Sequence, residues 1–184
     1  MAVASRPWAA DLLHLWFHRL RPADWFGVNP RVDDLLRRRF ARDLAMLSSR
    51  PAEEFLGDPQ TALAAVLLFD QVPRNIFRQS PRAFATDRLA RDICRGALAR
   101  GLDDGLTRRQ RQFLAMPLMH SEEIADQRLS LRVFAALGTG YGLAFARSHY
   151  AMIARFGRYP HRNPVLGRKS TPAEERAVAA GFRW

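Results

Sequence analysis

The sequence predicts an all-α fold, and three observations support this prediction. Apolar residues recur at helical spacing along the chain, whereas no segment sustains the period-two alternation of a half-buried strand. Signals for the start of a helix recur, each with a capping residue followed by a proline: Asn29-Pro30, Asp58-Pro59 and Thr171-Pro172. Helices of about 10 to 18 residues joined by short turns favour antiparallel packing of neighbours.

Three helices are predicted in the first part of the chain. The first carries an amphipathic stripe, which consists of Trp8, Leu12, Leu15, Trp16 and Leu20. The second begins at Asn29 and places acidic residues before arginines, as the helix dipole favours. The third follows Asp58 and is apolar on all sides from Ala62 to Phe69, so we expect it to be the most buried helix. We expect it to end near Val72, because Pro73 disfavours a helical conformation there.

The rest of the chain predicts further helices over residues 86–100, 107–114, 121–137 and 141–156, and a last one that starts at Thr171. Gly101 and Gly157 follow two of these ranges and are expected to end them in a left-handed conformation. Pro117 is expected to interrupt the helix that begins at Thr107, because proline lacks an amide hydrogen and crowds the preceding turn.

The length and composition are those of a single soluble domain that spans residues 1–184. The chain is 48% apolar and 26% charged, which is ordinary for a globular protein. The longest stretch without a charge, 133–146, is shorter than the ~20 apolar residues that a membrane-spanning helix needs. Asp11 and His14 interrupt the first apolar run, so no signal peptide is predicted. We therefore expect a cytoplasmic protein with no membrane partner, and the single cysteine, Cys94, excludes an internal disulfide.

The positive charge of the sequence is concentrated in two regions. The formal net charge is +11, from 29 basic and 18 acidic residues, and Lys169 is the only lysine. No Asp or Glu occurs in 71–86 or in 127–173, although both regions contain several arginines. Nucleic-acid binding would suit this charge, but no nucleic-acid-binding module is recognisable and most aromatic residues lie on apolar stripes. The sequence therefore favours a small anion over nucleic acid as the partner.

Each basic region contains a turn that is stiffened by a proline and carries arginine and asparagine. The first turn is DQVPRNIFR at 70–78, and the second is FGRYPHRNP at 156–164. If the two turns meet in space, their guanidinium and amide groups can form a fork for phosphate, sulfate or carboxylate. The predicted ligand-binding residues are Asp70, Arg74, Asn75, Arg78, His120, Glu122, Arg155, Arg158, His161, Arg162 and Asn163.

The same residues also have a purely structural interpretation. Arg74 and Arg162 can bond carbonyl groups at helix ends, and the asparagines can cap turns. A carboxylate at the end of an apolar helix is expected to be buried and paired, and Arg74 or Arg78 is the expected partner of Asp70. In that case the turns hold helix layers together and bind no ligand.

Histidines near the turns are the candidates for acid–base chemistry. His120 and His161 can act as general acid or base, because histidine titrates near neutrality. Together with Glu122 and His149 they also offer nitrogen and oxygen ligands, but no spacing typical of a metal motif is present. We therefore expect neither a metal nor a cofactor. His149 lies on an apolar stripe and is expected to be a hydrogen-bonded core residue.

Three parts of the sequence are similar to the motifs of one protein family. The first consists of DQVPRNIFR at 70–78 and PRAFATD at 81–87, the second of PLMHSE at 117–122, and the third of RFGRYPHRN at 155–163 and LGRKSTP at 166–172. In these motifs the chain resembles the bacterial domain-of-unknown-function family 924. The resemblance implies a TPR-like array of antiparallel helical hairpins, and it implies no activity, substrate or cofactor. The chain departs from the family pattern near Phe55, where a loop is shorter, and at Gln79, where a glycine is usual.

Three functions remain open on the sequence. The chain is a binder of an anionic small molecule, an enzyme of unknown reaction that uses His120 or His161, or a scaffold that presents a groove to a protein partner. The first two predict that six polar residues meet at one cavity: Arg74, Asn75, His120, Arg158, His161 and Arg162. The scaffold predicts that these residues are buried and paired with one another, and that an apolar groove is exposed elsewhere.

Overall fold

The computed structural model describes residues 6–138 and 140–181, and the regular secondary structure in these ranges is entirely helical. Within them no β-strand occurs, which confirms the predicted all-α fold. The α-helices are α1 (Pro7–His14), α2 (Pro22–Phe26), α3 (Pro30–Leu47), α4 (Pro59–Val66), α5 (Val72–Ile76), α6 (Asp87–Ala99), α7 (Arg108–His120), α8 (Ile124–Ala136), α9 (Gly140–Phe156) and α10 (Pro172–Ala179). Two π-helical turns lie at Leu15–Arg19 and Leu67–Gln71, and short 3₁₀ turns lie at Ala52–Phe55, Pro81–Phe84, Leu102–Gly105 and Pro160–Arg162.

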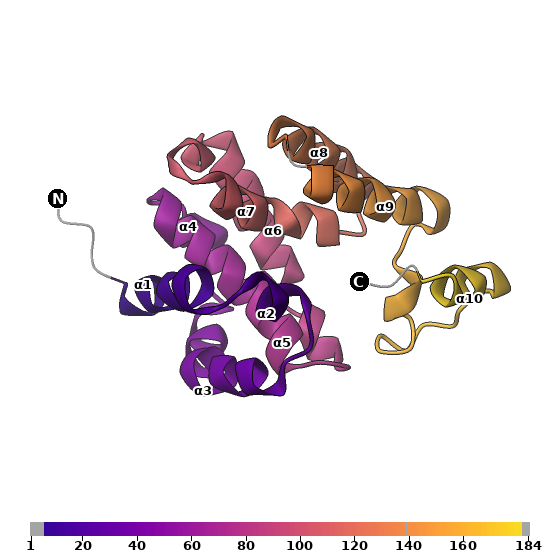
Figure 1. Cartoon of the computed structure of the whole chain (residues 1–184), viewed down its shortest axis with the longest axis horizontal. Coiled ribbons are helices and arrows are strands. Elements are labelled where there is room, and N and C mark those ends of the chain that lie inside the picture. The colour runs from indigo at the N-terminus through magenta and orange to yellow at the C-terminus, as the bar shows by residue number, and fades with distance from the viewer. Residues whose placement is uncertain (1–5, 139, 182–184) are drawn as a thin grey trace.

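The helices pack around a centre made by α4, α6 and α7 (Figure 1). Helix α1 packs on α4, and α3 packs against α5. Helices α8 and α9 pack side by side next to α7, and α10 lies at the periphery, beyond α9 (Figure 1). Contacts join α6 with α7, α7 with α8, and α8 with α9. From α6 to α9, neighbours in sequence are therefore neighbours in space, whereas α1 and α3 pack on helices further along the chain. The TPR-like description of the array stays a prediction.

One large apolar core joins α1 to α7, and two smaller clusters continue it toward the C-terminal helices. The largest fully buried aromatic side chains of the main core are Trp16, Phe40, Phe55, Phe69 and Phe113. The second cluster contains Met119 and Phe134, between α7 and α8. The third contains Ile153, Tyr159 and Ala177, and it attaches α10 to the end of α9. Burial of these aromatic and aliphatic surfaces is the main stabilising contribution to the fold.

The segment from α4 to α5 differs from the prediction in one respect. It is the most buried part of the chain, as predicted, and every residue from 61 to 73 is buried. The predicted end near Val72 is wrong, because the chain stays helical to Ile76. A π-helical turn precedes Pro73, and the amide of Val72 donates to the carbonyl of Leu67, five residues back. The wider turn accommodates the proline without ending the helix.

Helix α7 also continues through a proline. The predicted interruption at Pro117 is wrong, because α7 extends to His120. Phe113, Leu114 and Leu118 are all buried in the main core, and this packing holds the helix together although Pro117 removes one backbone hydrogen bond. As a result, His120 is the last residue of a helix whose C-terminal half is buried.

Most other helix ends lie close to their predicted positions. Gly101 and Gly157 follow α6 and α9 with positive φ angles of 65° and 66°. Gln79 also has a positive φ, of 58°, and the resemblance to the family leads us to expect glycine at this position. A residue with a Cβ is strained in this conformation, so Gln79 lowers the stability of the turn after α5.

The start of α8 differs from the prediction by a few residues. The helix begins at Ile124 rather than at Ser121. The Ser121 hydroxyl donates to Asp126 at 2.7 Å and accepts from the amide of Glu123 at 3.1 Å. These bonds stabilise a turn instead of a first helical turn at Ser121.

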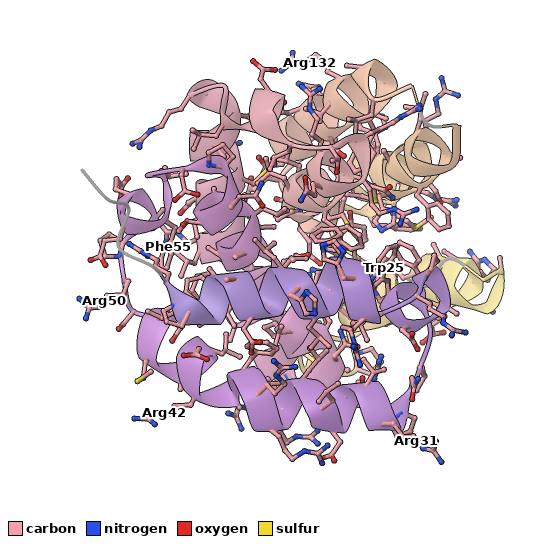
Figure 2. All side chains as sticks on the ribbon, turned by 60° about the vertical axis from the view of Figure 1, so that its left-hand side comes forward. Trp25, Arg31, Arg42, Arg50, Phe55 and Arg132 are labelled. Atoms are coloured by element: carbon pink, nitrogen blue, oxygen red, sulfur yellow. The ribbon has the colours of Figure 1, made fainter. Side chains whose placement is uncertain are left out.

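The outer surface carries many of the arginines. Arg31, Arg42, Arg50 and Arg132 project away from the helices (Figure 2) and are exposed. Among the described residues, no helix has the length and apolar character required to cross a membrane.

Candidate functional site

A cavity of about 400 Å³ lies at the meeting point of α2, α5, α7, α8 and α9. Its walls divide into an apolar part and a polar part. The apolar part consists of Trp25, Phe26, Met116, Met119, Phe134 and Phe145. The polar part consists of Gln71, Arg74, Asn75, Arg78, Gln112, His120 and His149, and Gly27 and Gly142 complete the lining. A cavity of this volume and mixed lining is typical of small-molecule sites, which measure about 300 to 1,000 Å³.

The polar wall is organised by Asp70 and His120. Nδ1 of His120 lies 2.7 Å and 3.0 Å from the two carboxylate oxygens of Asp70, and the Asp70 side chain is 1% exposed. Gln71 Nε2 donates to the same carboxylate at 2.5 Å, and Arg74 Nη1 lies 3.5 Å from it. The π-helical turn places Asp70 at this point, and the end of α7 places His120. The expected burial and pairing of Asp70 are therefore observed, with His120 as an additional partner.

The protonation of this pair follows from its surroundings. Burial raises the pKa of Asp70, but Arg74 and His120 lower it more, so the net pKa is well below the ordinary value and the carboxylate is ionised. Burial lowers the pKa of His120, and the opposing effect of Asp70 is not sufficient to restore it. His120 is thus neutral at pH 7 and donates Nδ1–H to Asp70, which leaves Nε2 as a proton acceptor on a residue that lines the cavity.

A second histidine of the cavity wall is held in the same tautomer. Nδ1 of His149 lies 2.8 Å from the carbonyl oxygen of Phe145, one turn back in α9, and therefore donates to it. The ring centroids of His149 and His120 are 6.4 Å apart. Burial is the main cause that lowers the pKa of His149 to about 3. The structure places His149 as the expected hydrogen-bonded residue, and it also places it at the cavity.

The arginines of the first turn line the cavity but are paired with aspartates. Arg74 donates two hydrogen bonds to Asp87, at 2.8 Å and 3.0 Å, and one to the Asp70 carbonyl at 2.7 Å. Arg78 donates to Asp33 through Nε at 2.5 Å and through Nη2 at 2.8 Å. Its Nη2 also lies 3.0 Å from Asn75 Oδ1, whereas Nη1 makes no hydrogen bond within the described part of the chain. One edge of Arg78 is consequently available to a ligand.

The second turn uses its polar groups to attach the C-terminal segment. Arg158 forms a two-bond pair with Glu174 in α10, at 2.6 Å and 2.9 Å. Glu122 accepts two bonds from Arg168, at 2.8 Å and 3.0 Å, and one from the amide of Tyr159 at 2.8 Å. These pairs match the structural interpretation of the turn.

The other residues predicted in this turn are similarly engaged. The guanidinium of Arg162 lies over the rings of Phe84 and Tyr159, at 4.7 Å and 4.6 Å from the centroids. Asn163 Nδ2 donates to Ser170 at 3.0 Å, and Arg155 is exposed and lies over the ring of Phe156. His161 is half-buried, and burial lowers its pKa to about 4.

The two turns do meet, and they meet at Asp87. One oxygen of Asp87 lies 2.8 Å from Arg74 Nη1, and the other lies 3.6 Å from Arg162 Nη1. The predicted ligand-binding residues are nevertheless divided between two places. Arg74, Asn75, Arg78 and His120 line the cavity with Asp70 directly behind them. Glu122, Arg155, Arg158, His161, Arg162 and Asn163 do not line it, so the sequence prediction of one shared cavity for both turns is wrong.

Two residues that position His120 are not indicated as such by the sequence. Gln127 in α8 donates from Nε2 to the carbonyls of Met119 at 2.9 Å and Ser121 at 2.6 Å. The Tyr159 hydroxyl donates to the same Met119 carbonyl at 2.5 Å. These bonds satisfy carbonyl groups at the C-terminal end of α7 on either side of His120, and they fix its backbone. No sequence motif marks such a lone glutamine.

Comparison with known proteins agrees with the family motifs. The model of the family described as "Bacterial protein of unknown function (DUF924)" matches residues 12–181. The chain belongs to this family. A solved structure of a protein of unknown function, ATU0120 from Agrobacterium tumefaciens, is similar to this DUF924 chain. The similarity covers 94% of this chain and 97% of the ATU0120 chain, with 35% sequence identity and a TM-score of 0.88. No curated protein matches the sequence. These similarities establish the fold of this DUF924 member and assign no reaction to its cavity.

The histidine and acidic side chains near the cavity of this DUF924 protein form no cluster of metal ligands within the described residues. Over the described residues, no group of three or more histidine, cysteine, aspartate or glutamate side chains is arranged to hold an ion. Asp70 and His120 are bonded to each other, and the carboxylates nearby are paired with arginines. The polar residues of the cavity wall can form hydrogen bonds, and the imidazole of His120 can transfer a proton.

Proposed function

We propose that this protein binds a small organic acid in the cavity, with the apolar body of the acid against the aromatic wall and its carboxylate toward Arg78 and Asn75. The observation that supports this most is the division of one cavity of about 400 Å³ into an aromatic wall and a wall of hydrogen-bond donors. Binding sites commonly combine an apolar lining with a few convergent polar groups, because the first supplies affinity and the second supplies orientation.

The charge balance of the polar wall argues against a ligand with more than one negative charge. Arg74 and Arg78 are matched by Asp87 and Asp33, and Asp70 adds a further negative charge behind them. A phosphate dianion is held best by several cations, whereas within the described residues both arginines of this wall are already paired with aspartates. A carboxylate can accept from Arg78 Nη1 and from the second amide hydrogen of Asn75, whose first hydrogen bonds the carbonyl of Gln71 at 2.9 Å.

The aromatic wall favours an apolar body. Trp25 is 8% exposed, whereas Phe26 and Phe145, at 50% and 36%, are among the exposed large apolar residues. Both phenylalanines line the cavity, so part of the exposed apolar surface of the molecule belongs to this site. A scaffold would instead present a groove remote from the polar cluster. Covering Phe26 and Phe145 with an aromatic or alkyl chain removes apolar surface from water, which is favourable by about 25 cal/mol per Å².

Calorimetry with a matched series of ligands tests this proposal. The probes are phenylacetate, 3-phenylpropanoate and hexanoate, with phenylacetamide and inorganic phosphate as controls for charge and for the apolar body. We expect the acids to bind, the amide to bind more weakly, and phosphate not to bind. We also expect proton uptake on binding, because a carboxylate near His120 raises the pKa of its imidazole.

Two lysine variants localise the binding. Arg78→Lys keeps a cation for Asp33 but removes the free guanidinium edge, so we expect at least a tenfold loss of affinity, which corresponds to about 1.4 kcal/mol. Arg132→Lys changes an exposed arginine that does not line the cavity and should leave affinity unchanged. Equal affinities in the two variants, or no binding by any acid of the series, would refute the proposal.

A further inference from the structure

We propose that the cavity is an active site in which His120, oriented by Asp70, acts as the general base in the hydrolysis of an ester of the organic acid that the cavity binds. This inference rests on the proposed function, since the bound acid is then the product. The geometry that carries it is the Asp70–His120 pair at the cavity wall, in which Nδ1 is used by the carboxylate at 2.7 Å. Nε2 remains to accept a proton from a molecule in the cavity.

The pair has the features that a general base requires. The carboxylate fixes the tautomer and orientation of the ring, and it stabilises the imidazolium that forms when Nε2 accepts a proton. The His120 side chain is 13% exposed and that of Asp70 is 1% exposed, so the carboxylate is shielded while the imidazole remains accessible.

The charged and titratable groups around His120 come from several elements. Asp70 and Arg74 come from the π-helical turn and α5, His149 comes from α9, and Arg162 comes from the turn after α9. The two arginines and burial favour the neutral imidazole, while Asp70 favours the charged one, and the first effect is larger. His120 is therefore in the form that accepts a proton at pH 7.

The composition of the cavity selects water as the nucleophile. None of the described lining residues carries an aliphatic hydroxyl, a thiol or an amino group. A covalent acyl-enzyme of the serine or cysteine type therefore has no nucleophile there. Arg78 Nη1 and the free amide hydrogen of Asn75 are donors on the same polar wall, and they can stabilise the negative charge that develops on a carbonyl oxygen.

The reaction follows from these roles. His120 Nε2 takes a proton from water as the water oxygen bonds to the acyl carbon, and the carbonyl π electrons move to the carbonyl oxygen. The oxyanion accepts hydrogen bonds from Arg78 and Asn75. The carbonyl then re-forms, the bond to the alkoxy oxygen breaks, and the leaving alcohol takes the proton from Nε2. The products are the carboxylic acid, which ionises in solution, and the alcohol, so no other reactant is required.

Hydrolysis of 4-nitrophenyl phenylacetate, followed by release of 4-nitrophenolate, tests the inference on the full chain. The decisive variant is His120→Gln, because glutamine can still donate to Asp70 but cannot act as a base. General base catalysis contributes about 10² to 10⁴-fold, so we expect kcat/KM to fall by at least about 100-fold. His14→Gln is the control for reaction at a surface histidine, since His14 is exposed and lies outside the cavity, and its rate should equal that of the wild type.

Binding of phenylacetate, measured separately, distinguishes the possible outcomes. If His120→Gln binds phenylacetate within about threefold of the wild type and loses hydrolysis, the inference is supported. If phenylacetate binds but the ester is hydrolysed no faster by the wild type than by His120→Gln, the catalytic role is refuted and the proposed function survives. If phenylacetate does not bind the wild type, the proposed function fails first.

The pH profile of the wild type provides a readout that does not depend on the folding of a variant. We expect kcat/KM to fall at acid pH with one ionisation below the ordinary histidine value of 6.5, because protonated His120 cannot accept a proton. If kcat/KM does not change as the pH is lowered below 6.5, the assignment of His120 as the general base is overturned.

Discussion

Replacing Arg74 by methionine tests whether the arginines of the first turn are structural partners of aspartate. Arg74 is the two-bond partner of Asp87 and lies 3.5 Å from the buried Asp70 carboxylate. Removing one member of a buried ion pair costs about 3 to 5 kcal/mol, because the remaining charge stays desolvated. Asp70 keeps its bonds from His120 and Gln71, so we expect the lower end of this range, about 3 kcal/mol.

Urea denaturation at pH 7 measures this loss, with Arg38→Met as the matched control. Arg38 pairs with Asp34 on the outer face of α3, and its side chain is 66% exposed. Exposed pairs of this kind contribute about 0.2 to 1 kcal/mol, so the control should lose at most that amount. A loss below 1 kcal/mol for Arg74→Met would contradict the structural role of Arg74. Its guanidinium would then be free to bind a ligand, and the choice of a single carboxylate over phosphate would lose its basis.

Three further predictions concern residues at or near the cavity wall. Gln79→Gly should increase the free energy of unfolding in urea by about 0.5 to 1 kcal/mol, because it removes the strain of a positive φ at a small entropic cost. Stability should fall as the pH is lowered from 7 to 5, since unfolded His149 takes up a proton near pH 6.5 whereas the folded one does so near pH 3. The loss at pH 5 is about 2 kcal/mol, and His149→Gln should remove this part of the pH dependence in denaturant titrations. Gln127→Leu leaves the carbonyl of Ser121 without its donor and should cost about 2 kcal/mol and lower ligand affinity, as measured by urea unfolding and calorimetry.

Much of the fold is predictable because the relevant signals are local. Proline at a first helical position, capping residues and apolar stripes are set by a few neighbouring residues, and they locate α3, α4 and α10. The two errors in helix length both concern a proline within a buried segment. At Pro73 and Pro117, packing of the surrounding apolar side chains outweighs the local preference of proline.

The candidate site is only partly predictable because it is assembled from distant segments. The sequence indicates Asp70, Arg74, Asn75, Arg78 and His120, which lie together at the polar wall. It does not indicate that Asp33 and Asp87 neutralise the two arginines, since these aspartates are ordinary first-turn residues of α3 and α6.

The sequence does not indicate the aromatic wall of the cavity, for a similar reason. Phe134 and Phe145 are typical core residues of amphipathic helices, and only the packing of α8 and α9 against α7 brings them to the cavity. The second basic turn resembles the first in sequence, but its partners Glu122 and Glu174 attach it to other parts of the chain. Similar motifs therefore serve different roles because their neighbours differ.

Nitrogen-15 NMR of the His120 ring during a titration with phenylacetate tests whether this imidazole faces a bound ligand. At pH 7 we expect Nδ1 to be protonated and Nε2 not, and we expect phenylacetate to shift the Nε2 resonance while the ring of the exposed His14 is unaffected. A resonance pattern with the proton on Nε2, or a His120 ring that does not respond while the acid binds, would contradict the claim that this imidazole faces the ligand.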